Sequence, residues 1–430
     1  MGFAARGAAR ALSATLLAGV LGGALLSTAS ADEASVIAGT PVGVGQGSCG
    51  SGWSGGDAGP LTFALTNGSS AIQEVQIQET TSKRIFVDVE DLGIGATRSV
   101  ALALAAGRYR FLCLAADGAP SASPAWQLTG DYSGATTPGA LPATANDFVR
   151  AVDTYSAWTQ GQLIHLGADV ATLRAAVAAG NLVGARRAYR VAHRQYLLLG
   201  AAYGAFGDAG TAIDPQLTAG VTPLRDPELT GFPKLEAVLW HARPVARVKP
   251  AERTRMSRHR ALRSTRRAQR RLTAYLRRNA TPVATRLAGD VAALTRTFNH
   301  PVQPANIDMG LRSHEILEDA LRSELLGRND AGAHLTLFDI DAMIDATRDV
   351  IAPLRGLLAT RDADLATTDA WLARLQAYVD AFHHTATDSW TPYQRLSSAQ
   401  RRRLQATLSQ TLEYLSEIAV VLDPVQAGPA

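Results

Sequence analysis

The amino-acid composition changes sharply along the chain, and this change constrains the fold more than any other feature. Residues 35–130 are rich in Gly, Ser, Thr and Val and contain neither His nor Met. From residue 144 onward the chain is rich in Ala, Leu and Arg and carries all 9 of its histidines. About 400 residues are too many for one ordinary hydrophobic core. We therefore expect a multidomain α and β protein, with a strand-forming domain followed by a helical one.

The first 31 residues are typical of a signal peptide. Arg6 and Arg10 precede an apolar run, and an Ala-Ser-Ala sequence stands directly before Asp32, where a signal peptidase would cut. No Cys lies in or just after this run, so we expect an exported protein without a lipid anchor, which is periplasmic, extracellular or associated with the cell envelope. No later apolar stretch is long enough to span a bilayer.

Residues 32–132 are expected to form a small β-sandwich. Apolar and polar residues alternate in segments 61–66, 75–78 and 109–113, which are separated by turn sequences such as Asn67-Gly68. The only two cysteines are Cys49 and Cys113. In an oxidising compartment one disulfide is the simplest interpretation, and a metal site with two Cys ligands is the alternative. Residues 133–146 have the composition of a linker.

Residues 147–424 are expected to form an all-α domain, as one helical bundle or two bundles packed together. Long amphipathic segments follow one another with Pro and Gly at the breaks. The predicted helices cover approximately 147–165, 168–179, 182–203, 232–242, 250–278, 281–299, 306–327, 337–359, 363–384 and 398–422.

The segment His314-Glu315-Ile316-Leu317-Glu318 suggests a metal or acid–base site. At about 100° per residue, His314, Leu317 and Glu318 fall on one helical stripe, with Glu315 elsewhere. A buried His and carboxylate need a partner, which a bound cation, an Arg or another carboxylate could supply. A structural hydrogen-bond network is the alternative explanation of this segment.

Several landmarks in the helical domain resemble those of the EfeO and imelysin-like family, and they occur in the family's order. They are Ala192-His193, the Gly-rich segment 200–208 with 212–214, residues 231–236 with 239–241, and residues 314–318. With the strand domain, the resemblance covers nearly the whole mature chain. It implies a cupredoxin-like β-sandwich in front of an EfeO-like helical domain.

The resemblance also implies a function outside the cytoplasmic membrane. EfeO proteins are thought to capture iron, Fe2+ or Fe3+, for a membrane permease, in a system that includes a haem-peroxidase-like protein. The matching polar residues, which we predict as metal ligands, are His193, Asp208, Asp214, Glu236, His314, Glu315 and Glu318. No blue-copper centre is expected in the strand domain, because that domain has no His and no Met.

The chain departs from the family pattern at two expected ligand positions. The family has Gly-Phe-His-x-Leu-Glu where this chain has Pro233, so that only Glu236 remains of the His-x-x-Glu motif. A Leu at position 197 stands where the family usually has a carboxylate. Proline is tolerated in the first turn of a helix, so the fold can survive the first change.

We expect no catalytic residues and no enzymatic activity. The family's helical domain is catalogued as a metallopeptidase because of its His-x-x-Glu motif, which Pro233 interrupts here. His314-Glu315 is not followed by a second His in the place that a zinc peptidase requires. The leading hypothesis is an iron-binding accessory protein. A non-enzymatic cell-envelope interaction protein that has lost its metal site is the main alternative, and a degenerate metallopeptidase is the third.

A basic segment extends from residue 243 to residue 278, with Glu252 as its lone acid. The export signal and the lack of interleaved aromatic residues argue against nucleic acid as its partner. An anionic envelope polymer or lipid headgroups are plausible partners, because guanidinium groups bind phosphate well. A solvated helix face is the alternative.

Overall fold

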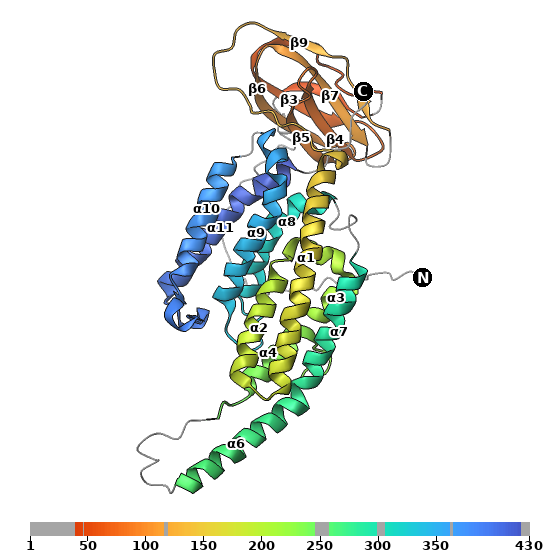
Figure 1. Ribbon diagram of the computed structural model, residues 1–430. Coiled ribbons are helices and arrows are strands. Elements are labelled where there is room, and N and C mark those ends of the chain that lie inside the picture. Colours follow the sequence, from red (N-terminus) through yellow and green to blue (C-terminus); the bar gives the residue numbers. More distant parts are fainter. Residues whose placement is uncertain are drawn as a thin grey trace, which may run out of the picture.

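A β domain and an elongated helical domain follow each other in the computed structural model (Figure 1). The structure describes residues 39–45, 47–115, 119–245, 258–298, 306–361 and 364–422. The predicted fold class, a strand domain followed by a helical domain, is confirmed. The predicted signal peptide lies outside the described residues. None of the described helices is long and apolar enough to cross a membrane.

The β domain consists of two sheets with a core between them. Its strands are β1 (Thr40–Val44), β2 (Gly56–Asp57), β3 (Gly59–Asn67), β4 (Gln73–Glu79), β5 (Ile85–Leu92), β6 (Thr97–Leu104), β7 (Gly107–Ala115), β8 (Ser121–Ala122) and β9 (Trp126–Thr129). One sheet has the order β1-β3-β6, and the other has the order β2-β9-β7-β4-β5 with β8 beside β7. The rings of Trp53, Phe63 and Phe111 meet edge to face in the core, with centroids 5.2 to 5.7 Å apart.

The three segments predicted as strands lie within β3, β4 and β7, but Asn67-Gly68 does not close a hairpin. Strands β3 and β4 belong to different sheets, so this turn carries the chain from one sheet to the other. Asn67 is fully buried, and its Nδ2 donates to the carbonyl oxygens of Ala71 and Leu92, both at 2.8 Å. The strands are not all antiparallel, because β1 pairs with β3 in parallel.

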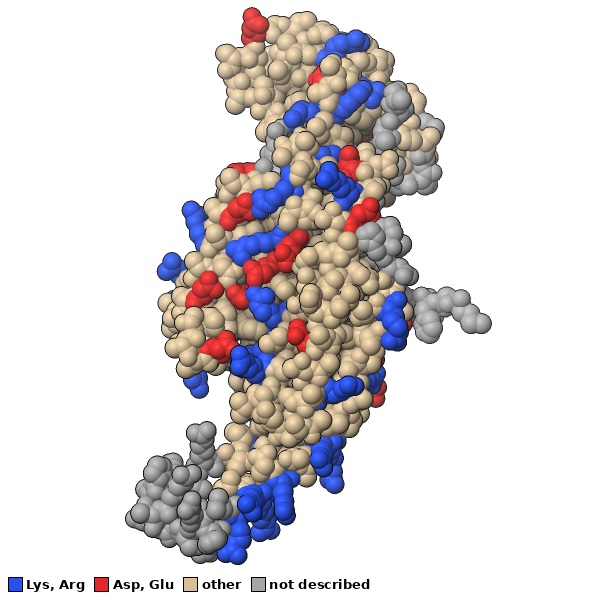
Figure 2. Space-filling view, in the orientation of Figure 1, with Lys and Arg blue, Asp and Glu red and all other residues tan. Residues whose placement is uncertain are grey.

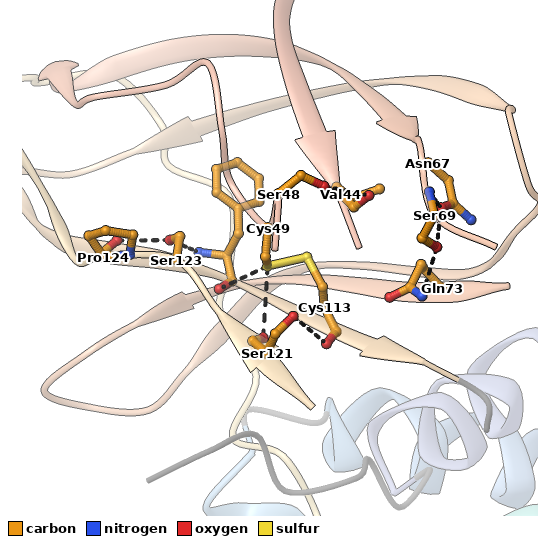
Figure 3. Close-up of a disulfide and its surroundings, with 11 residues drawn as sticks. Val44, Ser48, Cys49, Asn67, Ser69, Gln73, Cys113, Ser121, Ser123 and Pro124 are labelled. Atoms are coloured by element: carbon orange, nitrogen blue, oxygen red, sulfur yellow. Dashed lines mark hydrogen bonds between the residues drawn. A yellow bond between two sulfur atoms is a disulfide. The ribbon is translucent and has the colours of Figure 1, made fainter. Parts of the chain in front are cut away.

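Cys49 and Cys113 form the predicted disulfide (Figure 3). Cys49 lies in the loop after β1, and Cys113 is buried in the middle of β7. The alternative of a metal site with two Cys ligands is therefore wrong, since neither thiol is free. Beside the bridge, the Phe111 N–H donates to Ser123 Oγ at 2.9 Å, and that hydroxyl donates to the Pro124 carbonyl at 2.8 Å.

The segment predicted as a linker, residues 133–146, lies along the β domain up to Thr144, because the first helix already begins at Ala145. The Thr137 N–H donates to the Ala103 carbonyl at 2.7 Å, and the Ala140 N–H donates to the Ile85 carbonyl at 2.9 Å. Arg361 then ties the end of this segment to the helical domain, because its guanidinium donates to the Pro142 carbonyl at 2.9 Å. The predicted linker is therefore attached by backbone pairing to the β domain.

The helical domain is built around one large hydrophobic core. Its helices are α1 (Ala145–Ala178), α2 (Leu182–Leu197), α3 (Tyr203–Ile213), α4 (Gly231–His241), α6 (Arg258–Asn279), α7 (Thr281–Thr297), α8 (Asn306–Asp319), α9 (Thr336–Ala359), α10 (Leu365–Asp380) and α11 (Ser398–Val421). Helix α1 packs against α2 and α7, and α8 packs against α9 and α11. Figure 1 shows these helices side by side, with α6 extending away from the others.

Helix α1 is one continuous helix of 34 residues, where the sequence predicted two. Leu163, Leu166 and Val170 are all fully or almost fully buried, so the apolar stripe continues across the predicted break. Burial of this stripe against α2 and α7 outweighs the low helix propensity of Gly167, which costs about 1 kcal/mol relative to Ala.

The predicted helix 363–384 ends earlier, at Asp380, and its last residues form a small hairpin. Strand β10 (His383–His384) pairs with β11 (Ser389–Trp390). His383 stacks on Trp390 with ring centroids 4.5 Å apart. Because His383 and His384 are neighbours on a strand, their side chains point to opposite faces of the hairpin.

Candidate metal-binding site

A small cavity of about 160 Å³ lies among α2, α4, α9 and the segment after α8. Its walls carry an imidazole and several carboxyl groups, together with tyrosine rings. The lining residues are Tyr189, His193, Leu197, Tyr203, Asp214, Pro215, Gln216, Pro233, Glu236, Asp319, Ser323, Glu324, Asn329 and Met343. This concentration of ionisable groups makes the cavity the candidate functional site.

Asp214 and Glu236 reach the cavity because α3 and α4 meet closely at their ends. Asp214 is the residue that follows the last turn of α3, and Gly231 is the first residue of α4. Gly231 has φ 58°, and a Cβ atom there would lie 1.8 Å from the Ile213 carbonyl oxygen. Only glycine permits this approach, which brings the two carboxyl groups to the same cavity.

Both carboxyl oxygens of Glu236 accept hydrogen bonds. The Tyr189 hydroxyl donates to Oε2 at 3.0 Å, and the Ala333 N–H donates to Oε1 at 2.8 Å. Asp330 holds the loop that carries Ala333, because its side chain accepts from the His334 and Gly332 N–H groups at 3.0 and 2.9 Å. Glu236 is thus fixed in position by α2 on one side and by this loop on the other.

A π-helical turn at Ala320–Glu324 brings Glu324 into the site. The sequence predicted a regular helix over 306–327, whereas α8 ends at Asp319 and the wider turn follows. The extra residue in a π turn rotates the following side chains relative to an α-helix, and such turns are frequent at functional sites. Glu324 is buried, and its Oε1 accepts from Asn329 Nδ2 at 2.7 Å.

Asp339, in the first turn of α9, lies next to the Nδ1 side of the His193 ring. Its Oδ1 is 3.2 Å from His193 Nδ1, although the two groups are not aligned for a hydrogen bond. Carboxylates in this position commonly orient a histidine that binds a metal through its other nitrogen. The Nδ1 atom faces Asp339, so Nε2 is the nitrogen left for a ligand.

Burial raises the pKa of every carboxyl group in this cluster. It raises the pKa of Glu236 and of Glu324 to about 8 and that of Asp214 to about 6. In all three groups the neighbouring Asp339 raises the pKa further, and His193 lowers it. Burial, followed by the charge of Asp330, raises the pKa of Asp339 well above its usual range. The site therefore holds protons at neutral pH that a cation could displace.

The nearby basic side chains are directed to other partners. Lys234 Nζ donates to the carbonyl oxygens of Pro223, Leu224 and Asp226. Arg194 NH2 lies 3.2 Å from Asp341 and 2.5 Å from Asp345. In the described part of the chain, no three His, Cys, Asp or Glu side chains stand close enough to hold a metal ion in their present conformation.

Of the predicted ligands, the structure brings His193, Asp214 and Glu236 together. Asp208 lies on the exposed side of α3. His314, Glu315 and Glu318 do not line the cavity.

His314 and Glu318 share one stripe as predicted, with His314 Nδ1 3.9 Å from Glu318 Oε2, but the prediction that both point into the core was wrong. Ser313, Ile316, Leu317 and Ala320 form the buried face of this segment, and the side chains of His314 and Glu318 are 19% and 25% exposed. Glu318 also pairs with Arg322 at 2.7 Å, and Glu315 pairs with Arg312 at 3.1 Å. These pairs are typical of solvated helix surfaces.

The sequence reasoning missed Tyr189, Glu324 and Asp339. Tyr189 is four residues before His193, which places both on one face of α2, and this spacing could have suggested it. Asp339 falls in the first turn of a predicted helix, where an acid ordinarily stabilises the helix end. No sequence pattern indicated Glu324, because the direction of its side chain depends on the π turn.

The two departures from the family pattern both face the cavity. Pro233, in the first turn of α4, and Leu197, in the last turn of α2, are among the lining residues. The resemblance implies a nitrogen ligand at position 233 and a carboxylate at position 197, and both positions are apolar in this chain.

Comparison with known proteins agrees with this geometry. The family model described as imelysin, Peptidase_M75, matches residues 151–419, which include every carboxyl group of the cavity. The chain is also similar to the iron uptake system component EfeO of Escherichia coli (strain K12) and to the protein of the same name from Shigella flexneri. In both cases 21% of 375 residues are identical, over 85% of this chain and 86% of the relative.

Proposed function

Because the chain belongs to the imelysin family, we propose that it is an exported accessory component of an iron uptake system. On this proposal it binds iron in the cavity beside His193 and passes it to a membrane permease, with a haem-peroxidase-like protein as a further component of the system. It acts by binding and not by catalysis.

One observation carries the proposal. Asp214, Glu236 and Glu324 line one cavity, and Asp339 lies 3.2 Å from the His193 imidazole in its wall. None of these four carboxyl groups forms an ion pair with a described Lys or Arg. Burying several carboxyl groups without a cation is costly, and hydrogen bonds, the neighbouring His193 and protonation reduce this cost only in part. A multivalent cation would compensate the same groups once their protons leave.

The donor set fits iron better than a soft metal. Carboxylates with one imidazole suit Fe2+ and Fe3+, whereas the two cysteines are joined in the distant β domain. The side chains must move together to bind a cation, since no three of them now form a ligand set. Because binding requires proton release, the affinity for the cation should fall as the pH falls.

The test is a metal titration of the purified mature chain with Fe2+, Fe3+, Zn2+ and Cu2+. Replacement Asp339→Asn preserves shape and removes one charge, and we expect it to weaken iron binding at least about tenfold. His314→Ala and Asp208→Asn are the matched controls, because both residues lie outside the cavity, and they are expected to leave iron binding unchanged.

Two outcomes would contradict this assignment. Loss of iron binding in His314→Ala, with Asp339→Asn unaffected, would move the site to the outer face of α8. Absence of binding in the unaltered chain, with binding gained by Pro233→His, would mean that the chain retains the scaffold without its metal function. The presence of Pro233 and Leu197 in the cavity wall favours that second candidate, a cell-envelope interaction protein.

A further inference from the structure

Helix α6 carries a one-sided surface of arginines, which we call the arginine face. It consists of Arg263, Arg266, Arg267, Arg270, Arg271, Arg277 and Arg278, all of which are exposed. At about 100° per residue these seven positions fall within an arc of about 140°. They span roughly 23 Å along the helix axis at 1.5 Å per residue. No Asp or Glu occurs in the sequence of α6.

Among the described side chains, the opposite side of α6 contacts the domain from Gln269 to the C-terminal end of the helix. Leu272 is 9% exposed, Leu276 is fully buried, and the Tyr275 hydroxyl donates to the Val238 carbonyl at 3.4 Å. Further toward the N-terminus, Gln269 Nε2 donates to the Gly180 carbonyl at 3.3 Å. Figure 1 shows the preceding turns extending beyond the body of the domain, and Figure 2 shows basic side chains gathered at that end.

The arginine face is not neutralised within the part of the chain that the structure describes. None of its seven guanidinium groups forms an ion pair with a described carboxylate, whereas Arg194, Arg355 and Arg361 elsewhere do. Arginines three and four residues apart, such as Arg263, Arg266 and Arg267, repel one another and destabilise the helix. An external anion would remove this repulsion.

We propose that the arginine face is a docking surface for an anionic phospholipid membrane. Guanidinium groups bind phosphate through paired N–H donors, so phosphodiester headgroups match them chemically. The face is a straight, convex ridge at the end of the molecule and lines none of the cavities described above. A ridge of this shape meets a flat, densely charged surface along its length, whereas a flexible polyanion is usually held in a groove.

The contact is electrostatic and stays at the level of the headgroups. A helix that inserts into the interface needs a free apolar side, and Leu272 and Leu276 are already buried against the protein. Binding of this kind is reversible and weakens with salt, because the charges are exposed. Docking of this kind would hold the helical domain beside the membrane whether or not iron is bound in the cavity.

The experiment measures co-sedimentation of the mature chain with phosphatidylcholine vesicles that contain or lack phosphatidylglycerol. We expect binding only to the anionic vesicles, and its loss when salt rises from about 0.1 M to about 1 M. Changing Arg263, Arg266, Arg267 and Arg270 together to Gln should weaken binding about fivefold per residue, or more than about a hundredfold in all.

Two further variants distinguish an effect of the arginine face from an effect of the total charge and from misfolding. Changing Arg150, Arg174, Arg328 and Arg402 to Gln removes the same charge from exposed positions on other elements, and binding should persist. Changing the four α6 arginines to Lys retains the charge and should also preserve most of the binding.

Three results would overturn the proposal. The first is equal loss of binding in both Gln variants, and the second is failure of the unaltered chain to bind anionic vesicles. The third is binding to soluble linear polyphosphate without binding to vesicles, which would identify a polymer as the partner.

Discussion

Replacement Glu236→Gln should reduce the loss of stability that the helical domain undergoes as the pH becomes alkaline. Burial raises the pKa of Glu236 from 4.5 to about 8, so the folded protein holds a proton that the unfolded chain has already released. Its contribution to stability is complete below about pH 4.5 and is lost as the pH rises through about 8. A Gln side chain resembles the protonated acid and cannot ionise.

The hydrogen bonds of Glu236 allow this substitution without a packing defect. Gln Oε1 can still accept from the Ala333 N–H, and Gln Nε2 can donate to the Tyr189 hydroxyl, which rotates to accept. We therefore expect little change in the free energy of unfolding at about pH 5.

The size of the effect follows from the pKa difference. Between about pH 5 and about pH 8.5, a carboxyl group with unfolded and folded pKa values of 4.5 and about 8 loses about 4 kcal/mol of folding free energy. Entry of water into the cavity reduces this figure, so the expected difference between Glu236→Gln and the unaltered chain at about pH 8.5 is about 2 to 4 kcal/mol, in favour of the variant.

Urea unfolding followed by circular dichroism at 222 nm checks this prediction, since that signal reports the helical domain. Glu413→Gln on the exposed face of α11 is the matched control and should follow the unaltered chain at both pH values. If Glu236→Gln lost as much stability as the unaltered chain on going from acid to alkaline pH, Glu236 would not be the buried acid inferred here.

Two other substitutions test how the scaffold is held. Changing both Cys49 and Cys113 to Ser should lower the stability of the β domain by about 4 kcal/mol, because the bridge closes a loop with a sequence separation of 64. Thermal unfolding followed by near-ultraviolet circular dichroism measures this change, and an unchanged midpoint would contradict the prediction. Gly231→Ala should destabilise the helical domain by several kcal/mol and weaken iron binding, because the added Cβ would overlap the Ile213 carbonyl. Urea unfolding measures the first effect and iron titration the second. If the variant behaved like the unaltered chain in both assays, the close contact between α3 and α4 would not be needed.

Three residues of the candidate site could be predicted because each lies in a recognisable sequence motif. His193, Asp214 and Glu236 each belong to a landmark that resembles the EfeO and imelysin-like family, and the structure brings all three to one cavity. The metal-ligand role of these residues remains a prediction. The core-facing position predicted for His314 was wrong because apolar spacing alone does not determine which side of a helix packs against its neighbours. Its helix is rotated so that Ser313, Ile316 and Leu317 are buried instead.

The sequence alone was sufficient for properties that depend on local chemistry. The change in composition near residue 130 separates strand from helix, because Val and Thr favour pleated surfaces while Ala, Leu and Arg favour helices. The pairing of Cys49 with Cys113 followed from their number and compartment.

Only the tertiary structure decided which polar groups share a cavity. Glu324 enters it through a π turn, and Asp339 reaches His193 from a helix almost 150 positions away in sequence. These positions depend on helix packing over long sequence separations, which no local pattern encodes. The same holds for the arginine face, since its charges are visible in the sequence but their exposure depends on where α6 leaves the body of the domain.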